Sequence, residues 1–317
     1  MRAVRFENGQ VELVDAPRAA GEGVRVRIRG CGICGSDLAI LRSGFPLAGI
    51  PGHELAGELA DGTPVAIEPV APCGACEFCA RGDYQVCRSG NAMILGIGRD
   101  GGMAEELVVP ERCLVRLPMA VRVEDACLVE PLAVAVHGLR RAGVRGGERV
   151  CVVGGGAIGL CAVAASVAAG CETALVARHP AQVAAGRRLG AVAPGGEYDV
   201  AIDCAGTPSA AAECCERLRS NGTLLLLAAL WDAISLPGLP VAAKELAVVA
   251  STMYGRLGAA RDVDAAAALL AAKPAIAEAL ITHRFPLEAA PAAFAAARDR
   301  AGGAIKVVIE PRTRGPG

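Results

Sequence analysis

The sequence has almost no net charge. Its 317 residues include 32 lysines and arginines against 33 aspartates and glutamates, which leaves a formal charge of −1. A chain so balanced produces no global electrostatic field that would attract a nucleic acid or an anionic membrane surface. We therefore expect neither a nucleic-acid partner nor a membrane partner, and recognition should depend on local sites.

An apolar N-terminal leader is not expected either. The charged residues Arg2, Arg5, Glu7, Glu12 and Asp15 leave no room for the apolar segment of a signal peptide. The 14 cysteines are scattered through apolar runs, apart from one tight cluster, and do not form the pattern of a disulfide framework. These features predict a protein of the cytoplasm, where thiols stay reduced.

One uncharged stretch, residues 150–171, is long enough to span a bilayer. Glycines at positions 154, 155, 156 and 159 interrupt it near its start. A strand, a glycine turn and a buried helix of small residues explain this stretch better than a membrane span.

The chain is long enough for two cores, and 53% of its residues are hydrophobic. It has no internal repeat and no low-complexity linker. Up to about residue 120, short runs of Val, Ile and Leu are separated by Gly and Pro, which is typical of a small β-rich unit. The strands expected there are residues 24–28, 55–59, 65–67 and 106–109.

From about residue 148 to 250, apolar strands alternate with Ala-rich helices. We expect strands at residues 149–153, 173–176, 200–202 and 223–227. This alternation predicts an α/β fold with a doubly wound parallel sheet. A helix near 263–270 and a strand at 305–309 should follow, and the tail 311–317 should fray.

A glycine-rich run directly after the strand at 149–153 satisfies the pattern G-x-G-x-x-G. Its residues are Gly154, Gly155, Gly156, Ala157, Ile158 and Gly159. The glycines allow a tight turn, a close approach to a pyrophosphate and close packing of helix on strand, while the helix N-terminus faces the phosphates. A flexible glycine loop is the alternative, but the flanking strand and helix favour a dinucleotide site.

Four cysteines follow the spacing C-x2-C-x2-C-x7-C, at Cys73, Cys76, Cys79 and Cys87. Four thiolates within one loop suit a closed, tetrahedral Zn²⁺ site. Free or disulfide-paired cysteines, an iron–sulfur cluster and a nucleic-acid-binding zinc ribbon are the alternatives. The spacing is less typical of an iron–sulfur cluster, and only Arg81 and Arg88 lie nearby to support nucleic-acid binding.

A second constellation is dispersed over the chain. It consists of the run 32–37 (Gly-Ile-Cys-Gly-Ser-Asp), the run 52–54 (Gly-His-Glu) and the pair Glu130-Pro131. Each piece alone has an ordinary structural explanation. Their order, together with a four-cysteine loop and a glycine loop, points to a zinc enzyme.

These motifs resemble the zinc-containing medium-chain dehydrogenases of the alcohol dehydrogenase superfamily, and most of all the sorbitol and threonine dehydrogenase branch. The resemblance covers nearly the whole chain and includes the runs 130–133, 244–246, 281–287 and 305–308. It implies a GroES-like, β-rich catalytic domain at 1–131 that carries the structural zinc lobe. A Rossmann dinucleotide-binding domain at 132–253 and a return segment at 254–317, which completes the catalytic domain, are implied as well.

The resemblance also implies a catalytic zinc, and so two zinc ions per chain. Cys34 and His53 match the family's zinc ligands, while Glu54 and Glu130 match two carboxylates that compete for a further position. One carboxylate would bind zinc, and the other would lie behind it or exchange with water. Other members have a second cysteine at the place of Glu130.

Three further residues match family positions with assigned roles. Asp37 matches the residue that fixes the ring of the zinc-bound histidine, and Ser36 matches the hydroxyl that receives the substrate proton. Lys306 matches a basic residue near the cofactor pyrophosphate. Where many members carry a relay histidine, this chain has Ala39, so Ser36 would pass its proton through a ribose hydroxyl and water or through another group.

The predicted function is hydride transfer between a secondary alcohol and NAD(P), which gives the ketone. A Lewis acid is required because hydride leaves an alkoxide far more readily than an alcohol. A carboxylate in place of a thiolate favours polyols, amino-polyols or related sugar derivatives as substrates. A zinc-independent quinone or enone reductase and a non-catalytic zinc-bearing binding protein remain alternatives. A homodimer or homotetramer is expected.

The cofactor is expected to be NADP rather than NAD. NAD-binding folds carry an acid about 20 residues beyond the glycine loop, and here that count leads to Arg178. A guanidinium can bind a ribose 2′-phosphate that a carboxylate would repel. The alternative is a solvated surface arginine in a site that accepts both cofactors.

Overall fold

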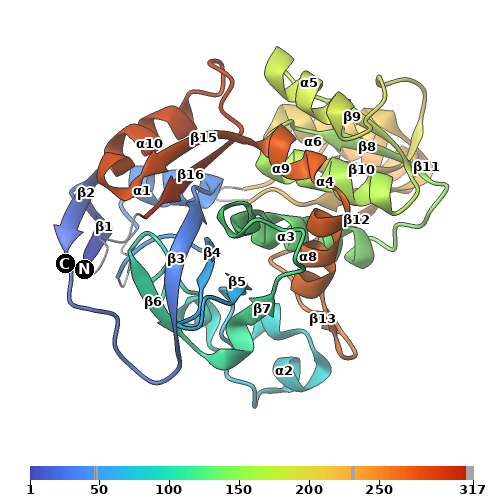
Figure 1. Ribbon diagram of the computed structural model, residues 1–317. Helices are drawn as coiled ribbons and strands as arrows, with labels where there is room; N and C mark the ends of the chain where they lie inside the picture. The colour runs from blue at the N-terminus through green and yellow to red at the C-terminus, as the bar shows by residue number, and fades with distance from the viewer. Residues whose placement is uncertain (46, 48, 230–232, 312–317) are drawn as a thin grey trace. The chain divides into compact units, whose positions relative to one another are not determined.

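The computed structural model describes residues 1–45, 47, 49–229 and 233–311 (Figure 1). The chain divides into two compact units. The first comprises Met1–Glu130, Gly255–Ala277 and the segment from Ile281 onward, and the second comprises Pro131–Tyr254 and Glu278–Leu280. The predicted return segment 254–317 includes Glu278–Leu280, which group with the second unit in the structure. Apart from Pro311, the tail expected to fray lies outside the described residues.

The first unit is built on a seven-stranded sheet. The strands follow the order β15-β16-β3-β4-β5-β7, and β6 pairs with β3. All neighbours are antiparallel except β15 and β16. The bounds are β3 (Val24–Gly32), β4 (Glu54–Glu58), β5 (Pro64–Ile67), β6 (Glu106–Val109), β7 (Leu114–Arg116), β15 (Ile281–Pro286) and β16 (Lys306–Glu310).

Alternation along β3 explains why one face of this sheet is buried. Val26 and Ile28 are fully buried, whereas Arg25 and Arg27, which alternate with them, are exposed, as the two-residue period of a strand requires. The same unit contains the hairpin of β1 (Arg2–Glu7) and β2 (Gln10–Asp15). Its helices are α1 (Gly35–Ser43), α2 (Glu77–Arg81), α8 (Asp262–Ala272) and α10 (Ala290–Arg298).

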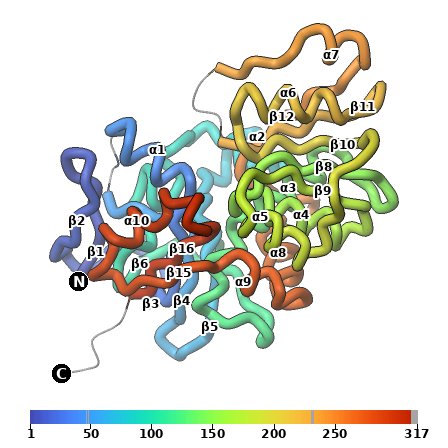
Figure 2. The backbone as a smooth tube through the Cα atoms, turned by 90° about the horizontal axis from the view of Figure 1, so that it is seen from above, coloured from blue at the N-terminus to red at the C-terminus, as the bar shows by residue number. Residues whose placement is uncertain are grey.

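The second unit contains a five-stranded parallel sheet in the order β12-β11-β10-β8-β9. Its strands are β8 (Arg149–Val153), β9 (Glu172–Val176), β10 (Tyr198–Asp203), β11 (Leu218–Leu226) and β12 (Ala247–Ala250). The connecting helices α4 (Ala157–Ala168), α5 (Pro180–Arg188) and α6 (Pro208–Arg217) can be followed in Figure 2, with α7 (Gly238–Ala243) after β11. After β9 the chain returns past β8 to β10, which creates the switch point where such sheets bind ligands. The chain passes from one unit to the other within α3 (Val129–Arg141), after Tyr254, and within and at the end of α9 (Ala275–Leu280).

The predicted strands overlap β3 to β6, β8 to β11 and β16, with shifted ends. Strand β4 ends at Glu58, and β11 begins at Leu218 instead of residue 223. The start of β11 was missed because residues 219–221 are polar and exposed. The hairpin of β1 and β2, together with β7 and β15, was not predicted.

The uncharged stretch 150–171 forms most of β8, the glycine turn and α4, as predicted. Within the described ranges, no helix has both the length and the apolar character that a membrane span requires.

Candidate active site and structural metal site

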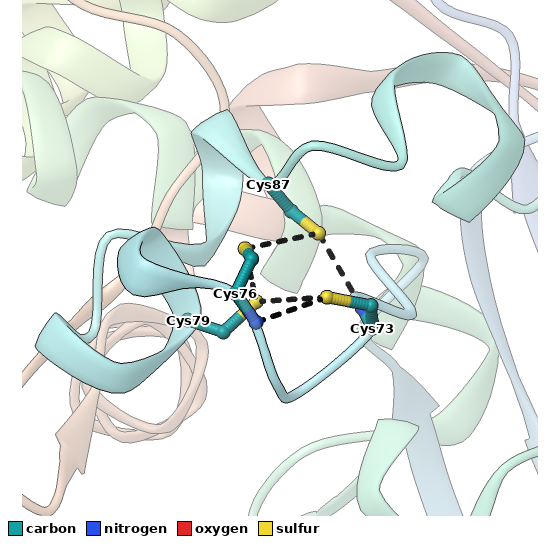
Figure 3. A group of neighbouring side chains, drawn as sticks. All are labelled: Cys73, Cys76, Cys79 and Cys87. Carbon is teal, nitrogen blue, oxygen red and sulfur yellow. Dashed lines mark hydrogen bonds between the residues drawn. The ribbon is translucent and has the colours of Figure 1, made fainter.

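The four cysteines of the predicted lobe converge on one point (Figure 3). Three of their Sγ–Sγ distances are 3.5 Å for Cys76 and Cys79, 3.8 Å for Cys76 and Cys87, and 3.9 Å for Cys73 and Cys79. A tetrahedral zinc with Zn–S bonds of about 2.3 Å separates its sulfurs by about 3.8 Å. A disulfide would need about 2 Å, and the four sulfurs lie too close together to enclose an iron–sulfur cluster. The set therefore fits one tetrahedral ion.

Backbone amides favour the thiolate form of Cys87. The N–H groups of Cys73 and Ser89 each point at its Sγ from 3.4 Å. Burial raises the pKa of Cys87, but these hydrogen bonds outweigh burial and lower it to about 6. A thiolate is the form that binds a metal, so the loop is prepared for a cation.

A second group of ligand atoms comes together in the first unit. The side chains of Cys34, His53 and Glu54 place one possible ligand atom each within 4.8 Å of one another. The strand register explains this, because Gly32 near the end of β3 pairs with Glu54 at the start of β4. Cys34 caps the N-terminus of α1 just after β3, and His53 directly precedes β4.

The two nitrogens of His53 face different partners. Nε2 lies 3.2 Å from Ser36 Oγ, and Nδ1 lies 3.6 Å from Oδ1 of the fully buried Asp37. Asp37 is itself held by the amide of Cys34, which donates to Oδ2 at 2.9 Å. A proton on Nδ1, facing Asp37, would leave the Nε2 lone pair available to a metal.

The electrostatics of His53 reflect the same surroundings. Burial lowers its pKa, but the negative charges of Asp37, Cys34 and Glu130 outweigh burial and raise it well above the ordinary value. So many negative groups around one buried ring favour a cation at this position. Nδ1 of His53 and Oδ1 of Asp37 have no hydrogen-bond partner. At 3.6 Å they are slightly too far apart for a hydrogen bond, and a small movement of either side chain would form one.

Lys306 has a partner that the sequence did not reveal. Its ammonium donates to both carboxylate oxygens of Glu54, one at 2.6 Å, and to the carbonyl of Ile33 at 3.1 Å. These three bonds use all three of its N–H donors. A contact between Lys306 and a cofactor pyrophosphate stays a prediction, and it would require the ammonium to give up one of these bonds.

Glu130 lies outside the group of three. It is the second residue of α3 and partly exposed, and in the described part of the chain the close ligand set comprises only Cys34, His53 and Glu54. Its charge is nevertheless one of those that raise the pKa of His53. Its role as a zinc ligand stays a prediction.

The glycine loop of the second unit joins β8 to α4. Gly154 has a φ of +111°, which favours glycine, and a Cβ on Gly159 would lie 1.8 Å from the carbonyl oxygen of Gly154. Gly156 caps α4, and a Cβ there would meet nothing within 4 Å. The first and third glycines thus permit the turn and its packing, while the second leaves open space before the helix N-terminus. Ala157 and Ile158 begin α4, where free amides can bind phosphate.

Arg178 follows β9 by two residues and is exposed. It makes no hydrogen bond or ion pair with any described residue. The guanidinium is therefore available to an anionic ligand.

Asp203, the last residue of β10, was not among the predicted site residues. Its buried carboxylate accepts the amides of Ala205 and Gly206, both at 2.9 Å, and so shapes the loop beside Gly154. An acid at the end of an apolar strand, three residues before a glycine, was the available signal.

Comparison with known proteins agrees with this geometry. The model of the alcohol dehydrogenase GroES-like domain matches residues 20–119, and the zinc-binding dehydrogenase model matches residues 157–272. A probable D-xylulose reductase A of Aspergillus niger is 30% identical over 346 aligned positions, which cover 96% of this chain and 93% of that protein. The chain belongs to the zinc-containing medium-chain dehydrogenases of the alcohol dehydrogenase superfamily.

Other members of this dehydrogenase family are similar over different shares of their length. An uncharacterized zinc-type alcohol dehydrogenase-like protein of Haemophilus influenzae is 33% identical over 183 residues, 53% of each chain. The sorbitol dehydrogenase of Bacillus subtilis is 28% identical over 253 residues, 69% of this chain and 71% of that enzyme. A putative zinc-binding dehydrogenase of Sinorhizobium meliloti, solved with NADP bound, has a TM-score of 0.85 and 28% identity, and the match covers 98% and 99% of the two chains.

Membership of this dehydrogenase family defines the general chemistry. The protein is a zinc-dependent oxidoreductase that uses a nicotinamide cofactor and acts on small-molecule alcohols. The Rossmann and GroES-like fold predicted from the sequence is confirmed.

Proposed function

We propose that this dehydrogenase oxidises a secondary hydroxyl of a polyol or sugar derivative at the centre formed by Cys34 and His53. The observation that carries the proposal is the convergence of Cys34, His53 and Glu54, with Asp37 facing Nδ1 of His53. A zinc ion held by these residues would lower the pKa of a bound alcohol and so promote loss of hydride. The names of the xylulose and sorbitol enzymes similar to this chain support the substrate class.

The proposed zinc ligands are Cys34, His53 and Glu130. Glu54 is the less suitable of the two carboxylates because both of its oxygens accept hydrogen bonds from Lys306. Coordination by Glu54 would break a buried ion pair, which is costly. Glu54 is therefore proposed as the residue behind the metal, and one position remains for water or substrate.

Ser36 is proposed as the first proton acceptor. Its hydroxyl lies 3.2 Å from Nε2 of His53, next to the proposed metal-binding atom. Ala39 offers no group for the next transfer, so the proton would continue through a cofactor ribose hydroxyl and water.

We further propose two zinc ions per chain with separate roles. The test is metal analysis of the purified protein, combined with cofactor reduction by a panel of polyols and other secondary alcohols. Cys34→Ala should retain the lobe zinc and the fold but abolish turnover, and Glu130→Ala should lower turnover by orders of magnitude or lose the catalytic zinc. Cys113→Ala removes a buried thiol elsewhere in the same unit and serves as the control. Full activity with one zinc or none would contradict the proposal.

NADP is the proposed cofactor. Arg178 is exposed, without a partner among the described residues, and follows the strand after the glycine loop. A guanidinium at this place can make two charge-assisted hydrogen bonds to a ribose 2′-phosphate.

A homodimer, or a homotetramer built from such dimers, is proposed for the assembly. Strand β12 ends the parallel sheet, and its four residues carry no charge. Val248 is 42% exposed on this strand. An uncharged, apolar edge strand favours pairing with another copy. Sedimentation equilibrium would test the assembly, and a monomer at all concentrations would contradict it.

A further inference from the structure

His53 enters the site from a segment that no strand ladder holds. The first paired residue of β4 is Glu54, which pairs with Gly32, so the backbone before it must be fixed by other contacts. Residues 50–52 supply these contacts by packing against residues 96–103. Three amides of the second segment donate to carbonyls of the first: Gly101 to Ile50 at 2.7 Å, Gly102 to Gly52 at 2.9 Å and Met103 to Pro51 at 3.0 Å.

Close packing of backbones makes this contact sensitive to side chains. Gly52 has a φ of +100°, and its carbonyl oxygen would lie 2.2 Å from a Cβ on Gly101 and 2.5 Å from a Cβ on Gly96. Real Cβ atoms do not approach oxygen so closely. The glycines therefore let residues 96–103 form a close-fitting support for the segment that carries His53.

Asp100 adds a side-chain hydrogen bond between these two segments. Its Oδ1 accepts the amide of Ile50 at 2.9 Å, from a position 50 residues away in the chain. A Cβ on Gly49 would lie 2.0 Å from the same oxygen, so the absence of a side chain at residue 49 is what lets the carboxylate reach the amide. The bond satisfies the backbone N–H three residues before His53.

We propose that Asp100 is a positioning residue for His53, because its bond to Ile50 helps to fix the backbone of the segment that carries His53. The inference rests on the proposed function, in which His53 binds the catalytic zinc. Metal affinity depends on ligand atoms that stay within a few tenths of an ångström of their places. Without this bond all of the zinc ligands would still be present, but His53 would be held less firmly.

The test compares Asp100→Ala with Asp100→Asn and with a matched control. Asp61→Ala removes a carboxylate that also accepts one backbone amide, that of Thr63 at 2.9 Å, in the turn between β4 and β5. The full-length, zinc-loaded proteins are mixed with a chromogenic chelator, and zinc release is followed with time. Cys34→Ala, which lacks the catalytic site, identifies the phase that belongs to the lobe zinc.

Asp100→Ala should release the catalytic zinc about tenfold faster than the parent, at the low end of what loss of a residue supporting a ligand costs, and the lobe phase should not change. Asp100→Asn should behave like the parent because its amide oxygen can accept the same N–H, and Asp61→Ala should match the parent. With Co²⁺ in the catalytic site, the visible absorption bands should change in Asp100→Ala alone. A general loss of stability would not alter these bands.

If Asp100→Ala and Asp61→Ala released the catalytic zinc at the same rate, the positioning role of Asp100 would be overturned, and the proposed function would not be affected. Failure of Asp100→Asn to restore slow release would also overturn it, since the hydrogen bond would not be the cause. A parent protein that held only the lobe zinc would instead contradict the proposed catalytic site, and the positioning role with it.

Discussion

Lys306 Nζ lies 2.6 Å from Oε1 of Glu54, and both side chains are buried. Burial lowers the pKa of Lys306, but the negative charges of Glu54 and Cys34 outweigh burial and raise it. The lysine therefore stays charged and compensates a carboxylate next to the proposed metal site.

Removal of one partner of this pair should destabilise the fold strongly. Lys306→Met leaves the Glu54 carboxylate buried without a counter-charge, and the free energy of unfolding should fall by about 3–5 kcal/mol. The double variant Glu54→Gln/Lys306→Met should recover most of this loss. Urea unfolding measures both, and Arg88→Met, which breaks an exposed ion pair with Glu77, is the control. A loss no larger than that of the control would contradict the prediction.

The ion pair between Arg2 of the N-terminal hairpin and Glu105 should make the stability of the fold depend on pH in the acidic range. Burial raises the pKa of Glu105, but three hydrogen bonds from Arg2 and its positive charge outweigh burial and lower it below the ordinary value of 4.5. The stabilisation is fully present above the unfolded pKa and is lost as pH falls through the folded pKa.

The free energy of unfolding of the Glu105→Gln variant should therefore be lower than that of the parent by about 1 kcal/mol near pH 7, and the difference should be small at about pH 3. Urea unfolding at both pH values tests this, with Glu111→Gln at an exposed position as the control. The same loss at both pH values would mean that ionisation of Glu105 does not contribute.

The four-cysteine lobe should depend on its metal for stability. Cys76→Ala leaves three thiolates, so the purified protein should contain one zinc fewer and unfold at a lower temperature, because binding of a structural zinc contributes directly to folding. Cys113→Ala should retain all zinc. Metal analysis with thermal unfolding measures the difference, and unchanged zinc in Cys76→Ala would rule out the four-thiolate site.

Cofactor preference should change with the charge at residue 178. A hydrogen bond to a charged group contributes roughly 1.5–3 kcal/mol, enough for about ten- to hundredfold discrimination. Arg178→Asp should shift the ratio of kcat/KM for NADP and NAD towards NAD by that factor. Arg187→Asp places the same charge change on an exposed position of α5 and should not alter the ratio. A parent that prefers NAD, or an unchanged ratio in Arg178→Asp, would refute the proposal.

Most strands could be predicted because apolar residues, which become buried, recur along them with a regular period. Val26 and Ile28 alternate with arginines in β3 and mark its buried face. Strand β15 lacks such a pattern, since His283 and Arg284 lie among its apolar residues. It pairs with β16 through the tertiary fold, which local sequence does not encode.

Within the site, Cys34 and Asp37 lie close in sequence, and the amide of Cys34 donates to the carboxylate of Asp37 within one helical turn. The contact was not predicted, and the role of Asp37 in orienting His53 stays a prediction. The role of Lys306 was predicted only from family resemblance, and its contact with Glu54 was missed.

The sequence by itself determined the four-cysteine loop and the glycine loop, because all of their residues lie within a single loop or turn and their spacing fixes their geometry. Only the tertiary structure decided that Lys306 pairs with Glu54, 252 residues away, and that Asp100 holds Ile50. With 32 basic and 33 acidic side chains in the chain, no local pattern specifies which cation meets which carboxylate. The pairs result from strand register and the packing of distant segments, which bring these charges to positions where burial requires a partner.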